Sequence, residues 1–182
     1  AMKKAERANL SQLIESMGFA DWAWIEPKDI QVAQWVRLKC MFGCREYGRN
    51  ASCPPNLPSV EECRQAIGEY RSAAILHFPK KLAKPEDRHD WSKEVNARLL
   101  ELEKAVFLAG YYKAFLLAMD SCALCGTCAG ERTACKNPRA ARPSPEAMGV
   151  DVFATARAAG FPIEVLRDTK QEMNRYALLL IE

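Results

Sequence analysis

Apolar residues in the first part of the chain recur at helical spacing and then in a short cluster. Leu10, Ile14 and Met17 lie three or four positions apart, which predicts a helix over residues 3–17. Gly18 follows at the position that a helix-terminating glycine takes. A tryptophan-rich cluster then predicts a short strand over residues 20–26.

A capping signal defines the next helix. Ser59 and Glu62 form the pattern in which each side chain accepts a free backbone N–H, so a helix is expected from Ser59 to about Tyr70. Residues 29–38 have a mixed pattern that indicates no single element. Residues 39–58 are rich in glycine and proline, and we expect irregular backbone there.

From residue 73 onward the pattern predicts strands around one long helix. Residues 87–109 carry apolar side chains at every third or fourth position and are followed by Gly110, so they form the longest expected helix. Ser144 and Pro145 resemble a helix start, with a helix expected to Ala159 and broken near Gly149. The expected strands cover residues 73–78, 112–119, 161–166 and 175–182.

This order of elements predicts an α+β fold: a mostly antiparallel sheet with helices packed on it and two cysteine-rich metal-binding loops. We expect a single domain over residues 1–182. Residues 1–72 would contribute the N-terminal helices and the first cysteine loop. Residues 73–182 would form the α+β core with the second cysteine loop. The two loops are expected to approach each other in space.

The composition is ordinary except for its cysteines. The chain has 182 residues, of which 49% are hydrophobic and 27% charged, so it can bury a core unaided. Its net charge of +3 is too balanced to indicate nucleic acid or an anionic membrane surface as a partner. No apolar run approaches the roughly 20 residues of a membrane span, and no secretory signal is visible. We therefore expect a cytoplasmic protein that does not bind membranes; the pattern indicates no oligomeric state.

Eight cysteines in a reducing compartment favour metal or redox chemistry over disulfides. The stronger signal is C-x2-C-x2-C spacing followed by a fourth cysteine, as in bacterial ferredoxins. It comprises Cys122, Cys125, Cys128 and Cys135. Such a run can wrap its sulfurs around one iron–sulfur cluster, most plausibly [4Fe-4S]. Zinc is the alternative, although structural zinc sites usually take two separate C-x2-C pairs.

The first cysteine group is looser. Cys40, Cys44 and Cys53 are followed by Pro54, and a proline after a cluster cysteine also occurs in the ferredoxin run. The group predicts a second iron–sulfur or metal site, a share in one common site, or a structural role. Cys53 could serve either site. Cys63 lies on an apolar helix face, so we expect a core residue, with a fourth ligand of the first site as the alternative.

Basic residues flank both cysteine groups. They can offset the negative charge of a thiolate cluster, lie on a solvated surface, or form a dock for an acidic redox partner. They are Arg37, Lys39, Arg45 and Arg49 near the first group, and Arg132, Lys136, Arg139 and Arg142 near the second.

These motifs together resemble the prokaryotic DUF2284 family, whose members are described as predicted metal-binding proteins. The likeness rests on the first cysteine group, the C-x2-C-x2-C run and the stretch from Cys135 to Val152, and it extends from about residue 36 to the C-terminus. It implies that seven cysteines match the family cysteines, and Cys63 falls outside the pattern. The seven are Cys40, Cys44, Cys53, Cys122, Cys125, Cys128 and Cys135.

The sequence favours a cytosolic iron–sulfur protein that binds one or two clusters for electron transfer or redox sensing, with a protein redox partner. One alternative is an interaction module stabilised by zinc. Another is an enzyme in which a three-cysteine cluster with an open iron acts as a Lewis acid. His77 and His89 have no spaced metal-ligand partner, and no phosphate-binding loop or nucleophile elbow is present. Whether the protein is an enzyme therefore stays open.

Overall fold

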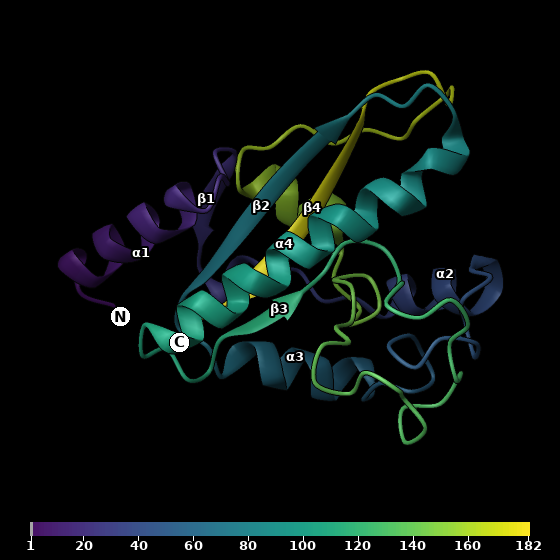
Figure 1. The fold of residues 1–182 in the computed structure, drawn as a ribbon, viewed down its shortest axis with the longest axis horizontal. Helices are drawn as coiled ribbons and strands as arrows, with labels where there is room; N and C mark the ends of the chain where they lie inside the picture. Colours follow the sequence, from purple (N-terminus) through teal and green to yellow (C-terminus); the bar gives the residue numbers. More distant parts are fainter. Residues whose placement is uncertain (1) are drawn as a thin grey trace.

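The computed structural model describes residues 2–182 and confirms the α+β prediction. Its sheet has four strands in the order β1-β2-β4-β3, and every neighbouring pair is antiparallel (Figure 1). The strands are β1 (Trp22–Ile25), β2 (Ala73–Lys80), β3 (Phe115–Leu117) and β4 (Met173–Leu180). The helices are α1 (Lys4–Ser16), α2 (Gln34–Gly43), α3 (Val60–Gly68), α4 (Arg88–Leu108) and α5 (Val152–Ala158), with 3-10 turns at Pro27–Asp29 and Pro85–Asp87.

The two longest strands, β2 and β4, lie at the centre of the sheet. β2 and β4 pair over eight residues each, from Ala73 opposite Leu180 to Lys80 opposite Met173. The chain leaves β2, runs through α4 and returns as β3, but β4 inserts between β2 and β3. This arrangement is a split β-α-β unit.

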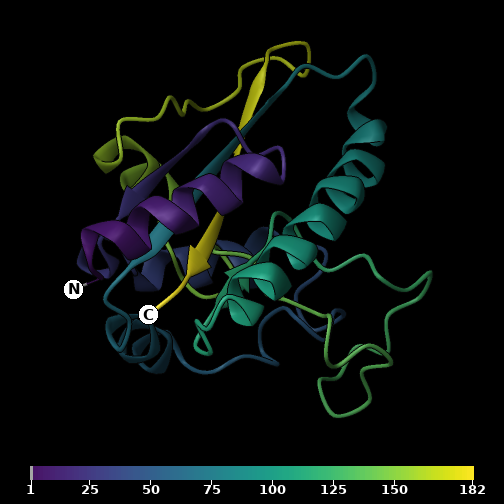
Figure 2. The same cartoon turned by 60° about the vertical axis from the view of Figure 1, so that its left-hand side comes forward.

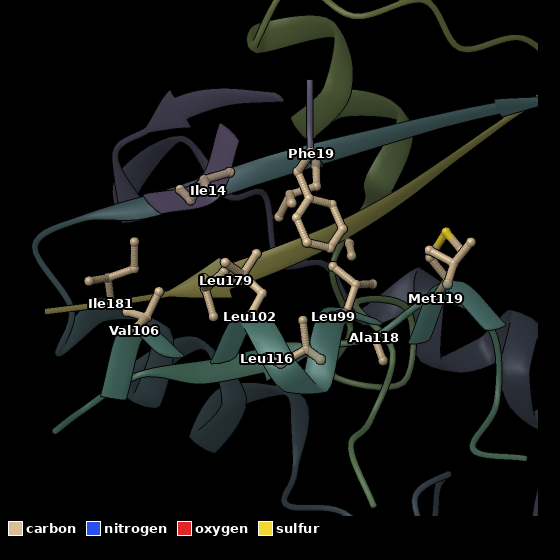
Figure 3. Packing of buried hydrophobic residues seen from close by; sticks show 14 of the residues in the cluster. Ile14, Phe19, Leu99, Leu102, Val106, Leu116, Ala118, Met119, Leu179 and Ile181 are labelled. Atoms are coloured by element: carbon tan, nitrogen blue, oxygen red, sulfur yellow. The ribbon is translucent and has the colours of Figure 1, made fainter. Parts of the chain in front are cut away.

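Helices α1 and α4 cover one face of the sheet (Figure 2). Fully buried leucines of α4, among them Leu99 and Leu102, pack against Leu116 and Leu179 of the strands, together with Ile14 of α1 (Figure 3). These side chains recur at helical spacing on α4 and at every second residue on β4, as one buried face of each element requires.

Helices α3 and α5 cover the opposite face. Ile67 of α3 and Ala156 of α5 belong to one buried cluster with Ile75 and Leu178, whose neighbours along each strand face α1 and α4 instead. The sheet is thus buried on both sides, which explains why β2 and β4 read as nearly continuous apolar runs in the sequence.

Several local predictions are confirmed. The expected helices at 3–17, 59–70 and 87–109 are α1, α3 and α4, and the Ser59–Glu62 capping box is present with both of its hydrogen bonds. The strands expected at 20–26, 73–78, 112–119 and 175–182 are β1 to β4, although β3 is confined to Phe115–Leu117.

Three expectations are wrong. Residues 39–43, expected to be irregular, are the last turns of α2, so Cys40 lies on a helix. No helix begins at Ser144: residues 145–149 form turns, and α5 begins at Val152 under an Asp151 cap. Residues 161–166 form no strand, because Ile163 packs into the cluster beneath the sheet instead of pairing at an edge.

Candidate metal centre

The two cysteine loops lie side by side at one end of the sheet (Figures 1 and 2). The first loop comprises residues 44–59, between α2 and α3, and the second comprises residues 120–142, after β3. Their burial differs sharply. Residues 50–54 of the first loop are all buried, whereas no residue from 121 to 140 in the second is buried.

Four hydrogen bonds connect the loops, one of them from the Arg132 backbone N–H to the Asn56 amide oxygen (3.3 Å). The Asn50 amide donates to the Cys122 carbonyl (2.9 Å), and the Asn56 amide donates to the Gly130 carbonyl (2.7 Å). The Ala51 backbone N–H donates to the Cys128 sulfur (3.3 Å). The loops therefore approach each other as the sequence predicts. These contacts join residues more than 70 positions apart, so no local sequence motif predicts them.

The three cysteines of the first group line one cavity of about 460 Å³. Cys40 lies in the last turn of α2, Cys44 caps that helix, and Cys53 is buried among the turns of the loop. Burial raises the pKa of Cys53 to about 12, with the nearby Cys44, Cys40 and Cys122 thiols adding to the effect. A metal that binds Cys53 must therefore displace a firmly held proton.

The cysteines of the second loop are half-buried and lie near the surface. They are Cys122, Cys125, Cys128 and Cys135. Two of their sulfurs accept hydrogen bonds: Cys128 from Ala51, and Cys125 from the Asn137 amide (3.0 Å). Donors aimed at sulfur stabilise thiolates and tune the potential of a bound cluster. Sequence reasoning missed Asn50, Asn56 and Asn137.

Cys63 lies apart from both loops. Its thiol is fully buried on α3, 3.7 Å from the sulfur of Met148, and it donates to the Pro58 carbonyl at 3.6 Å. It belongs to the apolar cluster beneath the sheet, in agreement with the position predicted from the helix face.

All eight cysteines are free thiols. Within residues 2–182, no three His, Cys, Asp or Glu side chains converge at the separation that a single metal ion requires. The donor chemistry nevertheless fits a thiophilic metal or cluster, since six thiols lie on two adjoining loops, Cys40 lies in the last turn of α2 beside them, and two of the sulfurs already accept N–H donors.

The comparison with known families agrees with this donor set. The family model described as "Predicted metal-binding protein (DUF2284)" matches residues 23–181. The chain belongs to the DUF2284 family. No curated protein and no solved structure matches it. Membership of DUF2284, together with eight free cysteines, supports a metal cofactor. No helix within residues 2–182 is long and apolar enough to cross a membrane.

Some basic residues near the loops of this DUF2284 protein belong to the scaffold. Arg142 forms a bidentate pair with buried Glu103: its Nη2 lies 2.8 Å from Oε2, and its Nε lies 2.8 Å from Oε1 and 3.0 Å from Oε2. Glu103 also accepts from the Leu116 N–H. Arg37 donates to the carbonyls of Pro58 and Ala147. Five others take part in no ion pair within residues 2–182: Lys39, Arg45, Arg49, Lys136 and Arg139.

Two acidic residues beside the first loop were also missed by sequence reasoning. Asp120 has φ +55°, a left-handed conformation that aspartate tolerates better than most residues. Its carboxylate accepts from Ser92 (2.6 Å) and lies 3.6 Å and 3.5 Å from Arg88 and Arg175. Burial raises the pKa of the second, Glu146. Both line the cavity that contains Cys40, Cys44 and Cys53.

Proposed function

We propose that this protein is a cytoplasmic iron–sulfur protein whose cysteine loops bind one or two [4Fe-4S] clusters for electron transfer or redox sensing. The observation that carries the proposal is the joining of the loops. Hydrogen bonds from Asn50, Ala51 and Asn56 gather seven of the eight thiols at one end of the molecule. A chain of this length can bury a stable core without disulfide bonds, so the fold itself does not need these thiols.

The proposed ligands fall into two neighbouring groups. The C-x2-C-x2-C run and the cysteine that follows it form the second site: Cys122, Cys125, Cys128 and Cys135. Cys40, Cys44 and Cys53 form the first, which is supported by their common cavity. The hydrogen bond from the Asn50 amide to the Cys122 carbonyl (2.9 Å) supports the inference that the two groups adjoin. Cys63 is not a proposed ligand, because it packs in the core.

A bound cluster would supply one-electron chemistry. The protein's own part is to bring the sulfurs together and to aim N–H donors at two of them. Ala51 and Asn137 are the donors, and both favour the reduced, more negative form. The unpaired cations near the loops, such as Lys136 and Arg139, suit an acidic protein partner at this end.

The direct test is the metal content of anaerobically purified protein. We expect iron and acid-labile sulfide in equal amounts, and visible absorption near about 400 nm that bleaches on reduction, as cluster redox chemistry requires. A colourless protein with stoichiometric zinc and no sulfide contradicts the proposal and assigns the loops to a zinc-stabilised interaction module.

Two substitutions give this test a matched control. Cys125→Ser removes a proposed ligand from an exposed loop, so it should remove one cluster's iron. Cys63→Ala removes a buried thiol outside the loops, so iron should stay at the wild-type level even if stability falls. Iron loss in Cys63→Ala with a native circular dichroism spectrum would overturn the ligand assignment.

A further inference from the structure

A second cavity, of about 480 Å³, adjoins the first cysteine loop and has a different character. Its walls are largely apolar and come from α2, from the start of α5, from residues 161–166 and from β4. Val36, Val152, Ile163 and Met173 are among its lining residues. The volume lies within the range of about 300–1,000 Å³ that small-molecule sites occupy.

Exposed apolar side chains surround this cavity. Trp35 is 48% exposed, Val165 76% and Leu166 43%, and all three belong to its lining. Three hydrogen bonds position residues 161–166: the Phe161 N–H donates to the Ala156 carbonyl (2.9 Å), Tyr176 donates its hydroxyl to the Pro162 carbonyl, and Arg157 donates to the Ile163 carbonyl (3.4 Å). This wall is therefore held in place although it pairs with no strand.

Two carboxylates lie where this cavity meets the cysteine cavity. The two cavities share Cys40, Cys44, Asp120 and Glu146. Three of the acids facing the apolar cavity already have partners or lie in solvent: Asp120 accepts from Ser92, Asp151 caps α5, and Glu164 is exposed. Burial raises the pKa of the fourth, Glu146, which favours its neutral form.

Arg175 is the group in this cavity with unused donors. Its guanidinium donates no hydrogen bond within residues 2–182, and it lies 3.5 Å from one Asp120 oxygen. Its side chain is 29% exposed, so it lies mostly within the molecule while keeping its donors free. Lys39 adds a second cation to the lining. A guanidinium with free donors at the end of an apolar cavity matches a carboxylate on an apolar molecule.

We propose that this cavity binds a small organic molecule with an apolar body and one carboxylate, that Arg175 binds the carboxylate, and that the bound molecule lies beside Cys40 and Cys44. The inference goes beyond the proposed function and does not depend on which metal the loops hold. It places a ligand-binding cavity beside the first cysteine site.

Calorimetric titration of the full chain with decanoate and with 1-decanol tests the proposal. The two probes share a ten-carbon apolar body and differ in the carboxylate. We expect saturable one-to-one binding of decanoate about 10–100-fold tighter than that of decanol, the ratio that charge-assisted hydrogen bonds give. Equal affinities, or no saturable binding of decanoate, overturn it.

Three variants locate the binding. Arg175→Gln should reduce the affinity for decanoate to that for decanol and leave decanol unchanged. Val152→Trp fills the apolar cavity and should abolish binding of both probes. Leu108→Trp adds the same side chain at an exposed position at the end of α4, outside the cavity, and should change neither. If Arg175→Gln does not fold, the decanoate-to-decanol ratio of the unmodified protein still decides.

Two further outcomes separate this proposal from its competitors. Decanoate binding that survives Val152→Trp would be surface association and would overturn the site. A dimer in sedimentation that Val152→Trp dissociates, without binding of either probe, would assign the cavity to a second copy of the chain. Titration before and after chelator treatment distinguishes failure of this proposal from failure of the iron–sulfur proposal. Binding by the apolar cavity should persist after chelation, even if the loops prove to hold no iron.

Discussion

The two cysteine loops of this protein differ in what holds their backbones. Residues 50–54 of the first loop are buried, and the loop follows α2 and leads into a capped α3, so the core shapes it. The second loop has no buried residue from 121 to 140 and contains no regular element. A segment that buries so little apolar surface gains little from the hydrophobic effect. The comparison indicates that the first loop is formed in advance, whereas the second depends on its ligand.

This difference predicts a structural role for a bound metal on one side only. Binding to preformed thiols contributes affinity, whereas binding to an unanchored loop also has to order that loop. Under this account, a metal or cluster stabilises residues 121–140 against proteolysis and exchange. The first loop and the sheet remain folded without it.

The largest expected effect comes from the salt bridge that attaches the end of the second loop to the core. Arg142→Met leaves the Glu103 carboxylate buried without its partner and should lower the free energy of unfolding by about 2–3 kcal/mol, since the side chains are only 19% and 7% exposed. Urea denaturation of the metal-free protein measures it. A loss below about 0.5 kcal/mol would mean that the core does not hold this end of the loop.

A smaller loss is expected at the junction of the two loops. Asn50→Ala removes the donor to the Cys122 carbonyl and the acceptor of the Ser52 N–H, so buried polar groups lose partners at a cost of about 1–2 kcal/mol. Iron release to a chelator should be faster than in wild type. Unchanged release would show that this contact does not position Cys122.

Ser59→Ala is the matched control for Asn50→Ala. Ser59 also lies in the first loop, but its hydroxyl contacts Glu62 of α3 and not the second loop. The substitution removes the hydroxyl that accepts from the Glu62 N–H and should cost about 1 kcal/mol of stability. Iron content and its release rate should stay at wild-type values, because α3 carries no proposed ligand. Faster release here would break the distinction between core-anchored and ligand-anchored backbone.

The smallest stability effect is expected for Asn137→Ala. This side chain is exposed, so the metal-free protein should change by about 0.5 kcal/mol or less. The donor to the Cys125 sulfur is lost, however, so the reduction potential of the second site should become more negative. An unchanged potential in a voltammetric titration would argue against Cys125 as a ligand.

Periodic segments of the fold could be predicted, and segments shaped by distant contacts could not. α4 was predictable because its buried face repeats over about four turns, from Ser92 to Val106. Residues 144–150 mimic a helix start through Ser144-Pro145, yet Gly149 takes φ +82° with Val60 only 3.2 Å from where a Cβ would lie. That turn lets Val150 bridge to Val32, a partner more than 100 residues away.

The candidate site likewise combines features that the sequence predicts with features that depend on distant contacts. The spacing of Cys122, Cys125 and Cys128 is visible in the sequence because a cluster needs sulfurs at short intervals. Asn50 and Asn56, which join the loops, carry no such spacing, since their partners lie in the other loop. Arg142 was expected to neighbour the cluster, but the structure pairs it with Glu103, and local charge counting cannot distinguish the two roles.

Amide hydrogen exchange on anaerobically loaded protein before and after removal of the metal tests this account most directly. We predict that protection is lost over residues 121–140, while residues 50–54 and the paired strands β2 and β4 keep theirs. Equal protection of residues 121–140 in both states would contradict the account, because the loop would then be ordered without a ligand. Loss of protection in β2 and β4 as well would contradict it from the other side, since the sheet would then depend on the metal.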